Sequence, residues 1–235
     1  MKPVPVDGRS LISKFFPGTG KSYDVVARRA SLGLDARWKR RALAHMPRSS
    51  SSILELAAGT GILTSMLLDQ YPSARVTAVD VTEDYVAVAK AKLAARGDGH
   101  RVTFLHGNAE SAEFEGPFDS CVSSYIPKYC DLDALARNVD RALTPGATVV
   151  FHDFNHPRGG FPRLVWRAWF GVLHLVAPTI WPEWAPTFDR DLMSLIKTSD
   201  WPKRSRAAFA ALGYDVGREH LTGHAATIVW ARKPR

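Results

Sequence analysis

The chain has 235 residues, of which 46% are hydrophobic, and its formal net charge is +8. This length and apolar content allow a full core within one domain, residues 1–235, with chain left over for a cap. No run reaches the roughly 18–20 uncharged apolar residues that cross a bilayer, and Met1–Pro5 lacks the apolar core of a signal peptide. The composition therefore excludes a membrane-spanning protein, and we expect a cytoplasmic location.

Residues 1–50 are predicted to form a helical cap, with helices over 23–34 and 36–45. Basic residues between positions 28 and 41, Lys39 among them, crowd these helices. Such a patch attracts nucleic acid, anionic lipid headgroups or an acidic substrate. No nucleic-acid-binding motif accompanies it and aromatic residues are not interleaved with it, so we expect no nucleic-acid partner. Peripheral contact with an anionic membrane, at its inner face, and a merely solvated helix face both stay open.

The segment 53–80 is the most informative part of the chain. An apolar strand over 53–57 leads into Ala58-Gly59-Thr60-Gly61, a helix opens at Ile62, and a second strand ends at Asp80. The glycines let backbone N–H groups approach a ligand, and the helix offers its positive N-terminal end. A carboxylate in the position of Asp80 accepts hydrogen bonds from both hydroxyls of a ribose. The pattern predicts an adenosine-like ligand.

Three side chains distinguish between adenosine-like ligands. Thr64 occupies the place where a dinucleotide fingerprint needs a third small residue beneath a pyrophosphate. Glu55, just before the turn, would repel a pyrophosphate and suits a cationic ligand, such as the ammonium group of S-adenosylmethionine (SAM). Asn108, after a strand over 102–106, offers an amide that can pair with the edge of adenine. We therefore predict SAM rather than a dinucleotide as the cofactor.

After this segment, the predicted strands and helices continue to alternate. The helices are expected over 83–95 and 132–143, and the strands over 119–124 and 147–153. Such alternation predicts a parallel sheet wound on both faces, with ligands at the carboxyl ends of the strands. The two cysteines, Cys121 and Cys130, provide neither a disulfide framework nor a zinc pattern, so we expect no metal.

Residues 154–199 interrupt the alternation and are predicted to form an insertion. Apolar and aromatic residues between Phe161 and Val176 predict a helix that is apolar around most of its circumference. An aromatic, proline-rich stretch follows at 181–186. A helix buried under its neighbours and a lid over a hydrophobic substrate both explain this pattern, and the two are compatible. The chain closes with a predicted helix and an antiparallel hairpin, over 200–212, 214–221 and 225–231.

Taken together, these pieces resemble class I SAM-dependent methyltransferases, most closely the ubiquinone/menaquinone biosynthesis C-methyltransferase family. The resemblance rests on Tyr23-Asp24, the stretch from Leu54 to Gly61, Asn108-Ala109-Glu110 and Leu221-Thr222-Gly223. It implies an α/β fold, a Rossmann-like, doubly wound, seven-stranded sheet whose last strand is antiparallel. It also implies SAM as cofactor and a hydrophobic small molecule as substrate.

The residues expected to contact the cofactor lie at the strand tips and in the cap. The resemblance implies contacts from Thr60, Asp80, Asn108, Ala109 and Ser124, and it places Tyr23 where the N-terminal helices close over the cofactor. With the glycine turn and the tip of the second strand included, the predicted cofactor-binding set is Tyr23, Glu55, Ala57, Gly59, Thr60, Gly61, Asp80, Val81, Asn108, Ala109 and Ser124.

Methyl transfer from a sulfonium requires in-line placement and the removal of a proton from the acceptor. The candidates for the proton step follow the fourth and fifth strands and are Lys128, Tyr129, Asp153 and His156. Alternation along the fifth strand puts His152 and Asp153 on opposite faces, so only one of them should meet the substrate. Asp153 matches an acidic family position and is favoured, with His156 second.

One departure from the family concerns the acceptor. Where the quinone enzymes have Gly-Leu-Arg-Asn, this chain has Ile126-Pro127-Lys128-Tyr129. The planar guanidinium of the arginine is thus replaced by the compact ammonium group of a lysine, and the amide of the asparagine by a bulky phenol. Three functions stay open: C-methylation of a quinol or phenol, polyprenylated ones included; O- or N-methylation of another hydrophobic metabolite; and a non-catalytic SAM-fold or membrane-surface binding protein. The intact cofactor set counts against the third, and no oligomeric state is predicted.

Overall fold

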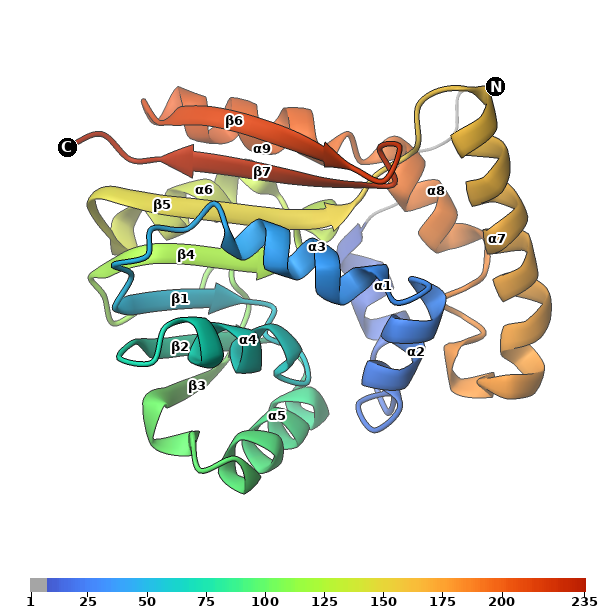
Figure 1. Ribbon diagram of the computed structural model, residues 1–235, viewed down its shortest axis with the longest axis horizontal. Helices are drawn as coiled ribbons and strands as arrows, with labels where there is room; N and C mark the ends of the chain where they lie inside the picture. Colours follow the sequence, from blue (N-terminus) through green and yellow to red (C-terminus); the bar gives the residue numbers. More distant parts are fainter. Residues whose placement is uncertain (1–7) are drawn as a thin grey trace.

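A seven-stranded sheet forms the centre of the molecule (Figure 1). The computed structural model describes residues 8–235, apart from the side chains of Arg9 and Arg190. The strands are β1 (Ser52–Leu56), β2 (Arg75–Asp80), β3 (Val102–His106), β4 (Phe118–Ser124), β5 (Leu143–Phe154), β6 (Asp215–Leu221) and β7 (Ala226–Arg232). Their order is β3-β2-β1-β4-β5-β7-β6. The first five are parallel, and β7 is antiparallel to both of its neighbours, β5 and β6.

The winding of the chain reverses between β1 and β4. From β1 the chain proceeds outward to β2 and β3, and it then returns to the other side of β1 to form β4 and β5. The loops that leave the carboxyl ends of β1 and β4 therefore diverge and leave a crevice, which is where open α/β sheets bind ligands.

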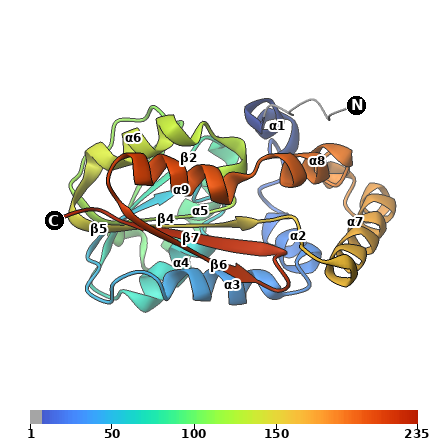
Figure 2. The same cartoon turned by 90° about the horizontal axis from the view of Figure 1, so that it is seen from above.

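Helices cover both faces of this sheet, as seen from above in Figure 2. One face carries α3 (Leu34–Leu43), α4 (Ile62–Gln70) and α5 (Glu83–Ala95), and the other carries α6 (Leu132–Ala142) and α9 (Trp201–Ala211). Because both faces are covered, β1 is apolar in consecutive positions: Ile53 packs with the α4 layer, whereas Leu54 packs with the α6 layer.

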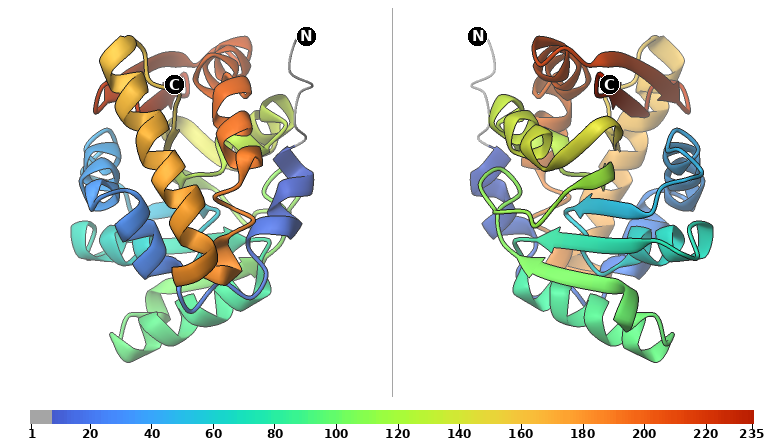
Figure 3. Two further views of the ribbon diagram at one scale, coloured as in Figure 1. Left: turned by 90° about the vertical axis from the view of Figure 1, so that its right-hand side faces the viewer. Right: turned by 90° about the vertical axis from the view of Figure 1, so that its left-hand side faces the viewer.

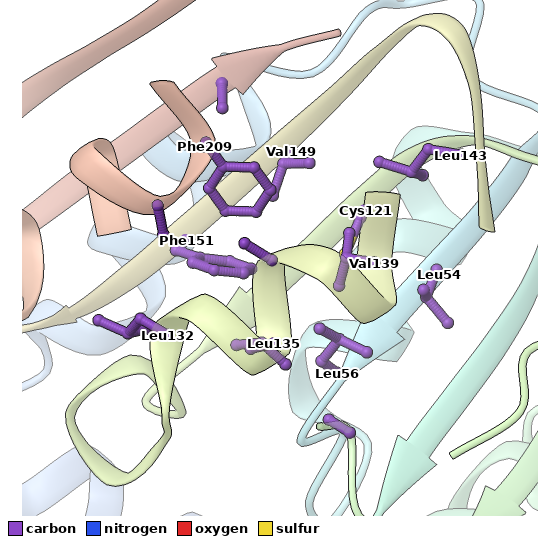
Figure 4. Close-up of a cluster of buried hydrophobic side chains, with 14 of the residues drawn as sticks. Leu54, Leu56, Cys121, Leu132, Leu135, Val139, Leu143, Val149, Phe151 and Phe209 are labelled. Carbon is purple, nitrogen blue, oxygen red and sulfur yellow. The ribbon is translucent and has the colours of Figure 1, made fainter. Parts of the chain in front are cut away.

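Local sequence accounts for the position of α6. Its first turn is capped by Asp131, whose side chain accepts the backbone N–H groups of Asp133 and Ala134. The apolar residues of the helix recur at helical spacing, and Figure 4 shows Leu135 beside Phe151 of β5 in the buried cluster. The cap and the apolar stripe together fix where this helix starts and which way it faces.

Beyond the carboxyl ends of the strands lies a group of helices from both ends of the sequence (Figures 1 and 2). They are α1 (Gly8–Phe15), α2 (Tyr23–Ala30), α7 (Gly160–Ile180), α8 (Arg190–Thr198) and the short 3₁₀ helices η2 (Pro127–Tyr129) and η3 (Pro182–Trp184); a third 3₁₀ helix, η1 (Gly99–Arg101), lies before β3. Two apolar clusters join them. The first includes Leu11, Phe15, Tyr129, Trp166, Phe170 and Leu195, and the second includes Val26, Leu173, Ala177 and Trp184.

The predicted parallel sheet and its antiparallel last strand are confirmed, whereas α1 and α8 were not predicted. The predicted helix over 23–34 ends at Ala30, because Leu32 and Gly33 adopt left-handed φ angles of 54° and 77°. The predicted basic patch is smaller than expected: Lys39 is buried and pairs with Asp35 within the same helix. Among residues 8–235, no helix is both long enough and apolar enough to cross a membrane.

Candidate active site

A cavity of about 700 Å³ opens at the carboxyl ends of β1, β2 and β4. Its volume falls in the range of small-molecule binding sites, roughly 300–1,000 Å³. One end, which we call the turn end, is lined by Ala57, Gly59, Asp80, Val81, Asn108 and Ala109. The other end, which we call the aromatic end, is lined by Ile12, Phe16, Tyr125, Ile126 and Tyr129. The cavity therefore occupies the reversal point of the sheet.

The turn after β1 forms as the sequence predicts. Ala57, Gly59 and Gly61 all have left-handed φ angles, of 53°, 60° and 79°, and α4 begins at Ile62. A Cβ atom on Gly61 would lie 3.2 Å from the Cβ atom of Ala89 in α5, so this glycine also permits close helix packing. Gly61 does not line the cavity, whereas Ala57 and Gly59 do.

Asp80 lies at the turn end and is held by backbone donors. One carboxylate oxygen accepts the N–H of Gly59 at 2.7 Å, and the other accepts the N–H of Thr82 at 2.8 Å. Burial raises the pKa of Asp80, and these hydrogen bonds oppose the rise. Each oxygen has further acceptor capacity, which suits the two hydroxyls of a ribose.

Glu55 is fully buried, and it does not line the cavity. Neither of its carboxylate oxygens has a partner in hydrogen-bond geometry among the described residues, and burial raises its pKa to about 8 against the opposing influence of the nearby Thr64 and Lys39. A buried carboxyl group without a partner is costly to a fold, and a cation near it would favour its charged form. This orphaned group, two residues before Ala57, fits the ammonium group of SAM.

Asn108 and Ala109 line the turn end beside Val81. The side-chain oxygen of Asn108 accepts the N–H of Glu110 at 2.9 Å, so this oxygen stabilises the turn itself. Recognition of adenine here would rest on the amide nitrogen of Asn108 and on the backbone.

Thr60, which was predicted to contact the cofactor, does not line the cavity. Its hydroxyl donates to Asp24 of α2 at 2.5 Å, and the other oxygen of Asp24 pairs with Lys92 of α5 at 2.5 Å. Thr60 thus fastens α2 to the glycine turn. The neighbouring Tyr23 does line the cavity, with its ring centroid 5.2 Å from that of Tyr85.

The aromatic end includes residues in and just after α1 that the sequence analysis did not identify. Phe16 lies edge-on to Tyr85 and to Tyr129, with a centroid distance of 5.9 Å in each case. The only sequence signal was the apolar pattern of Leu11, Ile12, Phe15 and Phe16 at helical spacing. This short segment closes the cavity on the side that the sheet leaves open.

Tyr125 is a further unpredicted residue of the aromatic end. It has a φ of 75°, its ring stacks on Phe154 at 4.8 Å, and its hydroxyl donates to Asp35 at 2.6 Å. Burial opposes ionisation of Asp35, but Lys39 and the Tyr125 hydroxyl outweigh this effect and lower the pKa of Asp35. Burial and the nearby Asp35 raise the pKa of Tyr125, so its phenol stays neutral.

Ser124, predicted to contact the cofactor, lines the cavity next to Tyr125. Its hydroxyl lies 3.2 Å from Nδ1 of His152, which is fully buried on β5. Burial lowers the pKa of His152 to about 3, so this imidazole is neutral at physiological pH.

Three of the four predicted catalytic residues do not line the cavity. Asp153, the favoured candidate for the proton step, is fully buried and pairs with Lys128 at 2.7 Å. The Nζ atom of Lys128 lies 4.4 Å from the ring centroid of Tyr129, which is the predicted catalytic residue that does line the cavity. The pair of Lys128 and Asp153 therefore packs behind Tyr129 and supports it. His156 lies outside, with its ring 5.3 Å from that of Trp166.

The structure also places His152 and Asp153 on opposite faces, as predicted from strand alternation. His152 contacts Tyr125 and Trp38 on the α3 side, whereas Asp153 contacts Lys128. Of the aromatic residues in the predicted insertion, neither Trp166 nor Trp169 lines the cavity. Trp166 is buried behind the aromatic end, in the cluster that contains Tyr129.

Comparison with known proteins identifies a family and a fold. Residues 53–146 match the family described as methyltransferase domain. The chain is 32% identical to a demethylmenaquinone methyltransferase from Thermus thermophilus, over 90% of this chain and 96% of that protein. It is 31% identical to a ubiquinone/menaquinone biosynthesis C-methyltransferase from Hahella chejuensis, over 66% of this chain and 65% of that protein.

Two solved structures share the fold at low sequence identity. A SAM-dependent methyltransferase from Aquifex aeolicus superposes with a TM-score of 0.65 at 16% identity, covering 93% of this chain and 99% of that one. The [4+2]-cyclase SpnF superposes with a TM-score of 0.56 at 17% identity, covering 84% and 81%. At these identities the likeness concerns the fold alone.

Proposed function

The chain belongs to the class I SAM-dependent methyltransferases, close to the ubiquinone/menaquinone biosynthesis C-methyltransferases, and on that premise we propose that it methylates a ring carbon of a hydrophobic quinol or phenol. Polyprenylated acceptors are included. The observation that carries this proposal is the aromatic end of the cavity, where Phe16, Tyr125 and Tyr129 surround space next to the turn end. Such a wall suits a flat, apolar ring.

For the cofactor, we assign the turn end. Asp80 would hold the ribose, Asn108 and Ala109 would meet the adenine, and the carboxyl of Glu55 would balance the ammonium group. Gly59, Val81, Ser124 and Tyr23 complete the contact set. When bound, SAM supplies a methyl group that its sulfonium charge already activates.

The protein's own contribution is placement of the acceptor and of its hydroxyl proton. Tyr129 is the predicted catalytic residue for which a place at the cavity wall supports a direct role. Burial raises its pKa, so Tyr129 acts as a neutral hydrogen-bonding group toward an acceptor hydroxyl. The Tyr125 hydroxyl donates to the ionised Asp35 at 2.6 Å, so its oxygen keeps lone pairs that can accept a hydrogen bond from the acceptor hydroxyl and orient it.

We further infer that residues 1–235 work as one methyltransferase domain. Residues 1–50 would be its cap and residues 154–199 its insertion, and the apolar clusters that join α1 and α2 to α7 support this division.

O-methylation of a hydrophobic metabolite is a second candidate function. The observation in its favour is Tyr129 itself, a phenol at the cavity wall where the quinone enzymes have an asparagine. A different acceptor geometry there would present an oxygen, rather than a ring carbon, to the methyl group.

The test is to incubate the purified chain with radioactive SAM and either demethylmenaquinol of short prenyl length or a lipid extract. We expect a labelled lipophilic product that retains both ring hydroxyls, with the product separated by thin-layer chromatography and its new methyl group located by NMR. A product in which a hydroxyl has become a methyl ether would support the second candidate. Absence of transfer to any quinol or phenol would contradict the proposal.

A further inference from the structure

The outer face of α7 presents a row of apolar side chains to solvent. Phe161, Leu164, Val165, Val172, Leu175 and Ile180 are all exposed, Phe161 and Leu175 at 76% each. The other large hydrophobic side chains exposed among the described residues are Val25, Leu32 and Val81. A concentration of this kind on one helix marks a surface that contacts something apolar.

The row follows from the sequence of the helix. Its members recur mostly at intervals of three, four and seven residues, as from Phe161 to Leu164 and from Val165 to Val172, which keep side chains on one side of a helix. The opposite side holds Trp166, Phe170, Leu173 and Ala177, which are buried against α1, α2 and α8. In the left view of Figure 3, α7 crosses the foreground of this end of the molecule. It can therefore meet a partner with its outer face while its inner face stays packed.

The charged residues within the segment that contains the helix are all basic. No Asp or Glu occurs in residues 154–182, which contain Arg158, Arg163 and Arg167. All three arginines are exposed, and the last two stand one helical turn apart beside the apolar row. An apolar face bordered by arginines is typical of helices that lie in the headgroup region of a bilayer, since long cationic side chains reach the phosphates while apolar ones enter the acyl boundary.

Helix α2 extends this basic border. The indole N–H of Trp169 donates to the carbonyl of Ala30 at 2.7 Å, which brings the end of α2 against α7. Arg28 and Arg29 are exposed there, and Arg29 lies 6.0 Å from the ring of Trp181. The acidic groups that follow in sequence are Glu183, which accepts from Ser22, and Asp189, which lies 3.9 Å from His174 of α7.

The inner face of α7 is one layer away from the cavity. Trp166 and Phe170 belong to the same apolar cluster as Tyr129, and Ile12 and Phe16 pack against that cluster. The last three of these residues line the aromatic end. A lipophilic molecule that leaves a bilayer at α7 would meet this cluster before it meets the cavity. A lipid surface thus matches the row in hydrophobicity, in charge and in its place next to the site.

We propose that the outer face of α7 inserts into the headgroup region of an anionic lipid bilayer and there delivers the acceptor to the cavity. The delivery rests on the proposed function, whereas the insertion does not. The apolar row enters the bilayer surface, and Arg163, Arg167 and the arginines of α2 bind the lipid phosphates.

The test is co-sedimentation of the full chain with vesicles of phosphatidylglycerol and phosphatidylcholine, and with vesicles of phosphatidylcholine alone. We expect binding to the anionic vesicles that weakens as salt rises, and at least tenfold weaker partitioning for the double variant F161S/L175S. R163Q/R167Q should also bind more weakly. The matched control is R75Q/R232Q, which removes the same charge from exposed positions at the opposite end of the sheet and should bind like the unchanged protein. The melting temperature and SAM affinity of each variant report whether it is folded.

Three outcomes would overturn the proposal. The first is that the unchanged chain does not sediment with anionic vesicles at low salt. The second is that F161S/L175S binds as well as the unchanged chain. The third is that sedimentation velocity shows a dimer that F161S/L175S converts to a monomer, which would mean that a second copy of the chain covers the row. Methyl transfer to a quinol dissolved in detergent is measured in parallel. If the unchanged chain binds the vesicles but does not methylate the quinol, the proposed function is contradicted and the proposed insertion into the bilayer is not.

Discussion

The two ends of the cavity are built from different kinds of sequence. At the turn end, the groups that face the ligand follow directly after β1, β2 and β3, and short hydrogen bonds such as Gly59 to Asp80 hold them. At the aromatic end, α1, η2 and the end of β4 meet through contacts between residues far apart in the chain, such as Phe16 with Tyr129. Local rules thus suffice for the turn end, whereas the aromatic end depends on tertiary packing. We expect substitutions at the two ends to separate cofactor binding from the placement of the acceptor.

The largest expected effect concerns the buried pair behind the aromatic end. Lys128→Met leaves the carboxylate of Asp153 buried without its cation, and breaking such a pair from one side costs about 3–5 kcal/mol of the free energy of unfolding. Urea denaturation measures this loss, and the double variant K128M/D153L should recover much of it. The exposed pair of Lys14 with Asp191 offers the control. If K14M and K128M cost the same, the pair does not support the aromatic end.

The next effect is at the turn end. Asp80→Ala removes the acceptor of the Gly59 and Thr82 N–H groups and, in our assignment, of the ribose hydroxyls. SAM should bind more weakly by about 1.5–3 kcal/mol, the range for hydrogen bonds to a charged group. Titration calorimetry gives the value, with NAD as the ligand that should not bind at all. Unchanged SAM affinity in a folded D80A protein would reject the assignment.

Glu55 gives the turn end a dependence on pH. The pKa of this carboxyl is about 8 in the folded chain against an ordinary 4.5, so between these values the unfolded chain releases a proton that the folded chain keeps. Stability without ligand should therefore fall as pH rises from about 4.5 to 8, at a limiting slope of about 1.4 kcal/mol per pH unit from this one group. Glu55→Gln should flatten that slope and raise the melting temperature at pH 8.

The same variant should bind SAM more weakly, since glutamine carries no charge to balance the ammonium group. Melting curves from about pH 5 to 8, the window in which the carboxyl titrates, and calorimetry near neutral pH test the two expectations together. A variant that gains stability and keeps full SAM affinity would show that Glu55 does not face the ligand.

The smallest expected effect sharpens the comparison at the aromatic end. Tyr125→Phe keeps the ring that stacks on Phe154 but removes the hydrogen bond to Asp35, whose pairing with Lys39 remains. We expect a loss of about 1 kcal/mol in stability, within the usual net range for one hydrogen bond. Methyl transfer to a quinol should fall while SAM affinity stays constant. Equal losses in both measurements would mean that the two ends are not separable.

The sequence predicted the turn end well because each of its parts has a local cause. The glycines mark left-handed positions, the strands alternate with amphipathic helices, and Asp80 ends a strand next to the turn. Glu55 shows the limit of this reasoning. Glu55 precedes the turn as the sequence indicates, but strand alternation does not tell whether its side chain lines the cavity, and in this structure it does not.

Apart from Tyr129, the aromatic end was not predicted, and this also has a physical reason. Asp153 was placed at the correct edge of the sheet, yet its pairing with Lys128 depends on how η2 folds back over β5, which no pattern within either segment reveals. Tyr125 is a similar case, because a tyrosine rarely adopts a φ of 75° and nothing in its neighbours announces it. The short helix α1 has too few residues for a periodic pattern to stand out.

The contacts of Asp24 have a consequence for protein engineering. This one carboxylate holds Thr60 of the glycine turn with one oxygen and Lys92 of α5 with the other. A chimera that takes its N-terminal cap from a relative with a different acceptor would need to carry Asp24, Thr60 and Lys92 as a set. The exchangeable module therefore ends before Tyr23. Helix α1 and the loop after it can then be grafted to change the acceptor, while the contacts of Asp24 that hold α2 to the cofactor site are kept.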